Sequence, residues 1–234
     1  MHEAVGLSTQ GLVRKNNEDQ FFSSVSAGLC VLADGMGGAQ AGETASALAV
    51  AAVAEVASSD APSLPLLETA FLEADRRVRH AAASDTTLRG MGTTLVAALE
   101  TPAGIAVSNI GDSRCWLWES GRLTQLTSDQ SWVNEVGRAL GLSEEVLSTH
   151  PLRHALTTAV GVGVDTRVQS RIVAAQAGSL ILLSSDGLHG VASDDAISAV
   201  LAQDGPLLAL CQSLIDLALA GGGPDNATVV LARV

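Results

Sequence analysis

Four aspartates stand where apolar runs of this sequence end or begin. Asp34 and Asp186 each follow such a run and precede a glycine. Asp112 also follows a run, and Asp225 stands just before the last one. In an antiparallel sheet the end of one strand lies beside the start of the next, so all four carboxylates can meet at one rim. Carboxylates that meet need a compensating cation, and oxygen ligands without a nearby Cys/His cluster favour Mg²⁺ or Mn²⁺. Taken singly, Asp-Gly is more typical of an ordinary turn.

A charged turn near the amino end adds a second kind of chemistry. It reads Arg14-Lys15-Asn16-Asn17-Glu18-Asp19. The planar guanidinium of Arg14 is suited to phosphate oxygens, and Glu18 is placed to reach a metal ion. Considered alone, such a turn is more often a solvated charged loop.

The elements that must position these residues follow from the apolar patterning. Residues 42–58, 66–83 and 206–220 have the pattern of helices, and the second of these is clearly amphipathic. Several predicted strands lie within residues 92–126 and are joined by short turns, which indicates antiparallel sheets. The order is not a regular βαβ alternation, so an α+β layered fold of one domain, 1–234, is expected. The predicted strands are 29–33, 93–99, 104–110, 113–118, 167–174, 179–184 and 228–234.

Residues 128–160 predict an insertion between strands, of the kind that covers a site and moves. They are polar at first and then form short helical pieces at 132–140 and 143–147. His150 and His154 have the i,i+4 spacing of zinc ligands. A proline separates them and no HExxH motif is present, so a surface or structural role is expected.

The composition excludes several classes of function. The chain has 234 residues, of which 47% are apolar and 16% charged, which excludes a disordered protein. Its net charge of −12 argues against binding to nucleic acids or anionic membranes. The acid excess fits either solubility or hard-cation binding. Three widely spaced cysteines predict buried thiols in a reducing compartment. No secretory pattern opens the chain and no stretch is long enough to cross a bilayer, so a cytoplasmic location is expected.

Six short motifs follow one another along the chain. They are Gly11-Leu12-Val13-Arg14 with Asn17-Glu18-Asp19, Val31-Leu32-Ala33-Asp34-Gly35-Met36-Gly37-Gly38, Met91-Gly92-Thr93-Thr94, Asn109-Ile110-Gly111-Asp112-Ser113-Arg114, Leu183-Ser184-Ser185-Asp186-Gly187 and Asp225-Asn226-Ala227-Thr228. In this order and spacing they resemble the type-2C (PPM), metal-dependent serine/threonine protein phosphatases, in their compact bacterial form. The resemblance extends from about residue 5 to the carboxyl end, and no single motif carries it.

The resemblance implies a four-layer αββα sandwich of two antiparallel sheets with helices on both sides. It also implies a pair of Mn²⁺ or Mg²⁺ ions bridged by Asp34. Asp186 and Asp225 would complete the coordination of one ion. The carbonyl of Gly35, with Glu18 directly or through a water, would coordinate the other.

Four more residues receive roles from the same resemblance. Asp112, together with Asp186, would hold a third, weaker ion. Asp19 and Asn226 would support the site from behind, and Arg14 would hold the phosphate of the substrate. The implied reaction is hydrolysis of phosphoserine and phosphothreonine in proteins, by in-line attack of a hydroxide that bridges the two ions. The implied partners are phosphoproteins and a bacterial serine/threonine kinase, with no nucleic acid or membrane, and the chain is expected to be a monomer.

The chain departs from the family pattern at two positions. Met36 stands where eukaryotic relatives often carry a histidine proposed as general acid, so the acid is a metal-bound water or absent. Gln130 replaces the histidine of an Asp-His-Ser element at the start of the flap, here Ser128-Asp129-Gln130-Ser131. The alternative to an enzyme is a pseudophosphatase that binds phosphoproteins without turnover. Such relatives usually lack a metal carboxylate, whereas this chain keeps them all.

Overall fold

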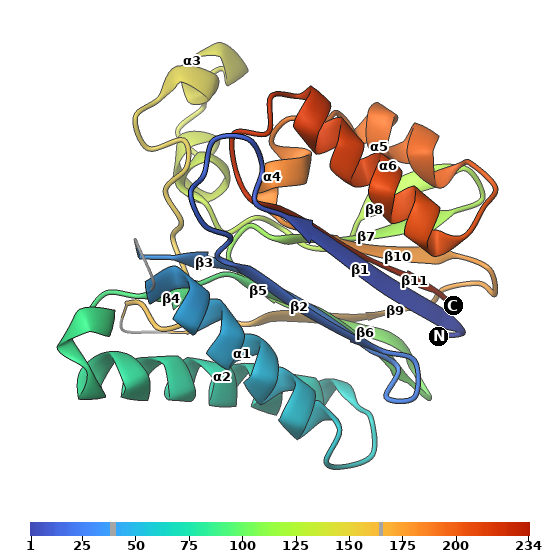
Figure 1. Ribbon diagram of the computed structural model, residues 1–234, viewed down its shortest axis with the longest axis horizontal. Coiled ribbons are helices and arrows are strands. Elements are labelled where there is room, and N and C mark those ends of the chain that lie inside the picture. Colours follow the sequence, from blue (N-terminus) through green and yellow to red (C-terminus); the bar gives the residue numbers. More distant parts are fainter. Residues whose placement is uncertain (38–40, 164–165) are drawn as a thin grey trace.

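Two antiparallel sheets face each other, and helices cover the outer side of each (Figure 1). The structure is a computed structural model that describes residues 1–37, 41–163 and 166–234; Gly38 of the second motif lies outside them. The four-layer αββα sandwich expected from the resemblance is therefore confirmed. The first sheet has the order β1 (Glu3–Thr9), β11 (Ala227–Arg233), β10 (Leu180–Ser184), β7 (Arg114–Glu119) and β8 (Arg122–Gln125). The second has the order β2 (Asp19–Ser24), β3 (Leu29–Met36), β5 (Leu95–Thr101), β6 (Gly104–Ile110) and β9 (Gln169–Val173), with the short β4 (Gly92–Thr93) paired to β3.

The first and last strands of the chain are neighbours. Strand β1 pairs with β11 along its whole length, from Glu3 opposite Arg233 to Thr9 opposite Ala227. The sequence patterns did not predict β1 or β2. Both are edge strands that are mostly half-buried, so they lack the continuous apolar run of the inner strands.

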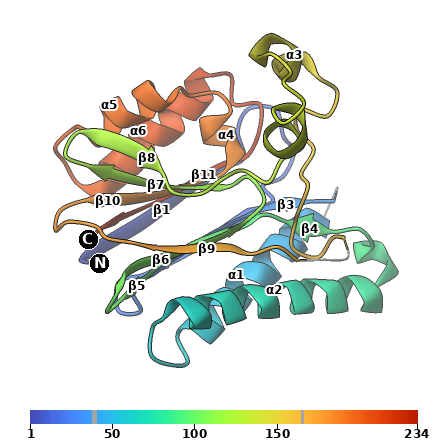
Figure 2. The same cartoon turned by 180° about the vertical axis from the view of Figure 1, so that it is seen from behind.

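Helices α1 (Ala41–Ala57) and α2 (Leu64–Ser84) pack under the second sheet, and α4 (Asp186–His189), α5 (Asp194–Leu201) and α6 (Leu207–Ala220) lie over the first (Figure 2). Helix α2 begins where Ser63 Oγ accepts the amide of Leu66 at 3.3 Å, with Pro65 in its first turn. The sequence predicted the three long helices. It expected one helix near the carboxyl end and missed α4 and α5, which are too short to show a helical period.

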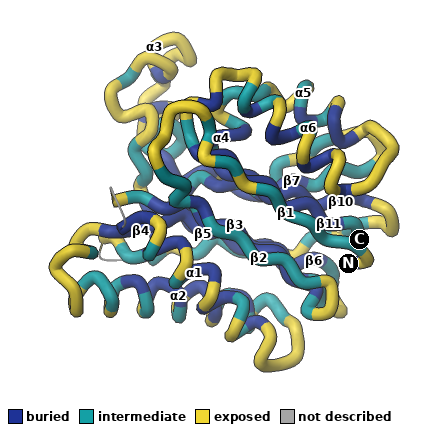
Figure 3. Tube along the Cα trace, in the orientation of Figure 1, coloured by how far each residue is buried: buried dark blue, intermediate teal, exposed yellow. Residues whose placement is uncertain are grey.

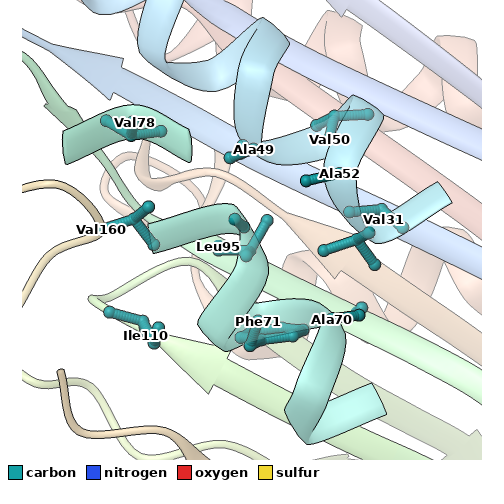
Figure 4. Close-up of a cluster of buried hydrophobic side chains, with 14 of the residues drawn as sticks. Val31, Ala49, Val50, Ala52, Ala70, Phe71, Val78, Leu95, Ile110 and Val160 are labelled. Carbon is teal, nitrogen blue, oxygen red and sulfur yellow. The ribbon is translucent and has the colours of Figure 1, made fainter. Parts of the chain in front are cut away.

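Three clusters of buried apolar side chains fill the spaces between the four layers of helices and sheets. The layer between α1, α2 and the second sheet contains Phe71, Leu95 and Val31 (Figure 4). Cys30 and Leu32 point the other way, into the layer between the two sheets. Because successive residues of a strand face opposite sides, a strand buried on both faces reads as an unbroken apolar run. The burial pattern of Figure 3 shows this in β5, β10 and β11, which are dark blue along most of their lengths. All three cysteines are buried and free, as predicted.

The segment predicted as an insertion lies between β8 and β9. It contains a π-helical turn, η2 (Val133–Gly137), and α3 (Glu144–Thr149), which stands apart from the sheets in Figure 2. His150 stacks on Trp132 with ring centroids 4.0 Å apart. This gives His150 the structural role that was expected. None of the helices in the described ranges is both long and apolar enough to span a membrane.

Candidate metal centre

A cleft of about 870 Å³ brings together the residues that the sequence analysis linked to metal or phosphate. Its lining comes from both sheets, from the loops at one end of the sandwich and from the segment between β8 and β9. The predicted residues that line it are Arg14, Glu18, Asp34, Gly35, Asp112, Asp186, Asp225 and Asn226.

Four different elements deliver the four aspartates. Asp34 is near the carboxyl end of β3, Asp112 is in the turn after β6, Asp186 is the first residue of α4, and Asp225 precedes β11. The expected convergence at one rim is therefore present, and it follows from the antiparallel order of the strands.

Backbone contacts fix Asp34. Its amide donates to Thr94 Oγ1 at 2.9 Å, and its carbonyl accepts from Thr93 Oγ1 at 2.8 Å and from the amide of Thr94 at 2.9 Å. The register between β3 and the start of β5 thus sets the position of this residue. It also explains why the predicted strand 93–99 divides at Thr94 into β4 and β5.

A close backbone approach holds Asp186 near Asp225. A Cβ at Gly187 would collide with the carbonyl oxygen of Asn226. Only glycine lets the first turn of α4 approach that loop, so the Asp-Gly pair is here a packing requirement as well as a turn.

Four aspartates in or behind the cleft have raised pKa values: Asp19, Asp34, Asp112 and Asp186. Burial is the largest cause for each, and the neighbouring carboxylates add to it. The pKa of Asp34 is raised well above its usual value, and the pKa of Asp186 is raised as well. The pKa of Asp19 and that of Asp112 are each raised to about 7. A site that resists ionisation in this way favours a bound cation.

Asp19 lies behind the cleft and is 3% exposed. Ser185 Oγ donates to its Oδ2 at 2.9 Å, whereas its Oδ1 is buried with no hydrogen-bond partner among the described residues. A buried oxygen acceptor without a donor, beside several crowded carboxylates, fits a site for hard divalent cations and their waters.

The described residues do not form a ready-made cage for an ion. Among residues 1–37, 41–163 and 166–234, no three Asp, Glu, His or Cys side chains are grouped closely enough to hold one. Asp225 also has a cationic partner already, because Arg14 Nη2 donates to its Oδ2 at 2.5 Å. An ion that binds Asp225 therefore has to compete with this guanidinium.

Asn226 organises the loop that carries Arg14 and Glu18. Its Oδ1 accepts the amide of Glu18 at 2.9 Å, and its Nδ2 donates to the carbonyls of Gln10 at 3.0 Å and Asn16 at 2.8 Å. The residue thus has a supporting position, which is where the sequence analysis put it.

The flap residues lie differently from the other predicted site residues. None of Ser128, Asp129, Gln130 and Ser131 is among the residues that line the cleft. Asp129 pairs with Arg114 at 2.7 Å, and the other buried members form the base of the flap. Instead, His154, Ala155 and Leu156 line the cleft from the far end of the flap. Sequence reasoning missed them because nothing in their pattern shows where the flap returns to the sheet. Met36 lines the cleft as well.

Comparisons with known proteins agree with this geometry. A family model described as protein phosphatase 2C matches residues 13–210. The serine/threonine protein phosphatase PstP of Mycobacterium tuberculosis is 40% identical over 232 residues, which cover 97% of this chain and 44% of that protein. The chain therefore spans less than half the length of this relative. The serine/threonine phosphatase Stp of Listeria welshimeri is 33% identical over 233 residues, which cover 96% of this chain and 92% of that protein.

Solved structures of PstP have the same fold. A crystal structure of the M. tuberculosis protein matches with a TM-score of 0.87 at 38% identity, over 99% of this chain and 98% of that one. A structure of the PstP catalytic domain in complex with two manganese ions matches with a TM-score of 0.86 at 36% identity, over 99% and 97% of the two chains. Since the family model covers most of the sequence and relatives match nearly all of it, the chain belongs to the protein phosphatase 2C family.

Proposed function

We propose that this chain hydrolyses phosphoserine and phosphothreonine in proteins with the help of Mn²⁺ or Mg²⁺. The observation that supports this best is the cleft itself, where four aspartates from four elements stand beside one arginine. The likeness to relatives named serine/threonine phosphatases points the same way.

The metal ligands of the proposal are all oxygen donors. Asp34 would be shared by two ions, Asp186 and Asp225 would complete the ligands of one, and the Gly35 carbonyl with Glu18 would bind the other. Asp112 is assigned to a third, weaker ion. The crystal structure of the PstP catalytic domain with two manganese ions supports the pair and not the third. When bound, such a pair of ions lowers the pKa of a water and so supplies a nucleophile at neutral pH.

The charge of the cleft makes substrate binding depend on cations. A phosphate monoester is a dianion near pH 7 and is repelled by four clustered carboxylates. Arg14 is the cationic side chain in the described lining of the cleft that is suited to a phosphate fork, and half of its side chain is exposed. We assign to it the binding of two phosphate oxygens and the stabilisation of charge on them during in-line displacement.

The leaving serine or threonine oxygen needs a proton. Met36 lines the cleft at the position of the family's histidine, and its thioether has no proton to donate. We therefore assign this proton to a water.

The biological setting is proposed on chemical grounds. Hydrolysis of phosphoserine and phosphothreonine reverses the action of a serine/threonine kinase, so a cognate kinase and its phosphorylated targets are the proposed partners. We propose a cytoplasmic monomer with a single domain, 1–234, in which the segment at about 128–160 acts as a flap.

Metal-dependent hydrolysis of a phosphothreonine peptide tests the proposal. We expect turnover with Mn²⁺ or Mg²⁺ and none in excess EDTA. Asp186→Asn should abolish metal-dependent turnover while the circular dichroism spectrum stays that of the folded protein. A folded wild-type protein that binds the phosphopeptide without turning it over would instead be a pseudophosphatase, and full activity of Asp186→Asn would refute the assignment of the metal site.

A further inference from the structure

The two residues that precede Arg14 in the sequence have large apolar side chains that are exposed to solvent. Leu12 and Val13 are in the loop between β1 and β2, and each is 68% exposed. Among the large apolar side chains of the described residues, only Leu140 in the flap is exposed to the same extent. Leu12 Cγ lies close to Gly223, but most of both side chains remains in contact with water, which opposes the exposure of apolar surface.

The backbone of this loop is held in place. The amide of Leu12 donates to the carbonyl of Gly223 at 2.8 Å, and Gln10 Nε2 donates to the carbonyl of Arg14 at 2.6 Å. Gly11 has a φ of +75°, and a Cβ there would collide with the carbonyl oxygen of Asp225. Leu12 and Val13 are therefore presented outward by a fixed loop that is fastened to the metal-binding loop, and they are not part of a loose end.

The position of the pair relates it to the substrate. Arg14 lines the cleft, and the loop stands beside α4 at the cleft end of the sandwich (Figure 1). Consecutive Cα atoms are 3.8 Å apart, both along the loop from Leu12 to Arg14 and along a polypeptide whose phosphate reaches Arg14, so residues one to three positions from the phosphorylated one are within reach of Leu12 and Val13. Part of the cleft wall is also apolar, at Met36, Leu156 and Val191.

We propose that Leu12 and Val13 form a docking surface for the polypeptide that flanks the phosphorylated residue, and that they favour substrates with a large apolar side chain within about three positions of it. The inference rests on the proposed phosphatase activity and adds a substrate preference to it. The continuity of the pair with the phosphate-binding Arg14 points to the substrate as occupant.

A pair of matched peptides tests this proposal. Both carry one phosphothreonine, with leucine at the three positions on either side in one peptide and serine in the other. Wild-type protein with Mn²⁺ should hydrolyse the leucine peptide with a kcat/KM about tenfold higher, the discrimination expected when an apolar side chain is buried on binding. Leu12→Ser/Val13→Ser should reduce the ratio of the two kcat/KM values to near one. This ratio is internal to each variant, so a general loss of activity cancels.

The control and the contrary outcomes separate the claims. Leu208→Ser removes an equally apolar side chain, 54% exposed, from the first turn of α6, and should keep the preference of the wild type.

Equal hydrolysis of both peptides by the wild type, or a preference that survives the double substitution, overturns the docking surface and leaves the phosphatase intact. Hydrolysis of neither peptide is a failure of the proposed function instead. A dimer that dissociates in the double variant, with no peptide preference, assigns the surface to a second copy of the chain and also overturns the proposal. Leu12→Ser and Val13→Ser made singly repeat the test if the double variant does not fold.

Discussion

Asn226 shows how one side chain assembles a site from distant parts of the chain. Its three hydrogen bonds reach Glu18, Gln10 and Asn16, more than 200 positions away in sequence. An amide is suited to this position because it both donates and accepts. An aspartate here would donate to neither carbonyl. The loop that carries Arg14 therefore depends on a residue next to Asp225, a proposed metal ligand from another segment.

Arg14 has two competing partners, and its substitution should separate them. Arg14 pairs with Asp225, and in the proposed reaction it binds phosphate. Arg14→Ala should reduce kcat/KM for a phosphopeptide by about 10²–10³-fold, the usual cost of removing one donor to a developing charge. Mn²⁺ affinity, measured by calorimetry, should stay the same or rise because a competing cation is gone. Arg14→Lys should recover only part of the activity, since an ammonium lacks the planar fork. A large loss of Mn²⁺ affinity in Arg14→Ala would contradict these roles.

At this scale the sequence predicted the chemistry and not all of the geometry. The aspartates and Arg14 were found because their residue types and their places beside apolar runs are visible in one dimension. His154 was expected to have a surface or structural role, whereas it lines the cleft near Asp186. Its place depends on the path of the flap, which no local pattern specifies.

The flap joins the sandwich through a buried amide. Gln130 is fully buried, its Oε1 accepts the amide of Gly111 at 2.8 Å, and its Nε2 donates to the carbonyl of Arg167 at 2.8 Å. Its own backbone bonds to Gly111 and to Thr157. The start of the flap, its return and the turn before Asp112 are thus tied at one point.

Removing this amide should destabilise the protein. Gln130→Met keeps the size of the side chain and removes the partners of the buried Gly111 amide and of the carbonyl of the more exposed Arg167, at a cost of about 1–3 kcal/mol for the buried group and less for the other. We expect the free energy of unfolding in urea to fall by roughly 1–4 kcal/mol. The same substitution at the exposed Gln212 of α6 should change it by less than about 0.5 kcal/mol. Equal effects at the two positions would show that the buried hydrogen bonds contribute little.

Elements with a strong local pattern were predicted well, and those that depend on tertiary contacts were not. Residues 104–110 were assigned as β6 with the observed bounds, because an inner strand is apolar on both faces. Strands β1 and β2 have polar and small residues at the sheet edges, and α4 has a single turn. Their conformations come from pairing with β11 and β3 and from packing under α6, which a local window does not contain.

At the scale of the whole molecule, the aspartates with raised pKa values lie together at the cleft end of the sandwich. A carboxyl whose pKa is raised on folding binds more protons in the folded state, so the free energy of unfolding falls as the pH rises through the interval between its unfolded and folded pKa values. For Asp19 and Asp112 this interval runs from about 4 to about 7. The buried His189 has the opposite sign, since burial lowers its pKa, and its contribution is complete above about pH 6.5.

The metal-free protein should therefore lose stability between about pH 5 and 7, where the raised pKa values of Asp19 and Asp112 act together and outweigh the opposite contribution of His189. In EDTA its melting temperature should fall by roughly 2–6 °C over this range. Saturating Mn²⁺ should make the fall smaller, because bound cations compensate the ionised carboxylates. Asp19→Asn removes one of the titrating groups and should also reduce the fall. A melting temperature in EDTA that is constant or rises with pH would refute the electrostatic account of the cleft.

The pairing of β1 with β11 has a consequence for the timing of activity. A ribosome releases the chain from its amino end, so β1 emerges first and has no pairing partner until residues 227–233 have been made. Asp225 and Asn226 immediately precede that partner, and they complete both the cleft and the loop of Arg14. A nascent chain that stops short of them has neither a closed first sheet nor a complete cleft. On the proposed function, dephosphorylation therefore begins only after the ribosome has passed β11.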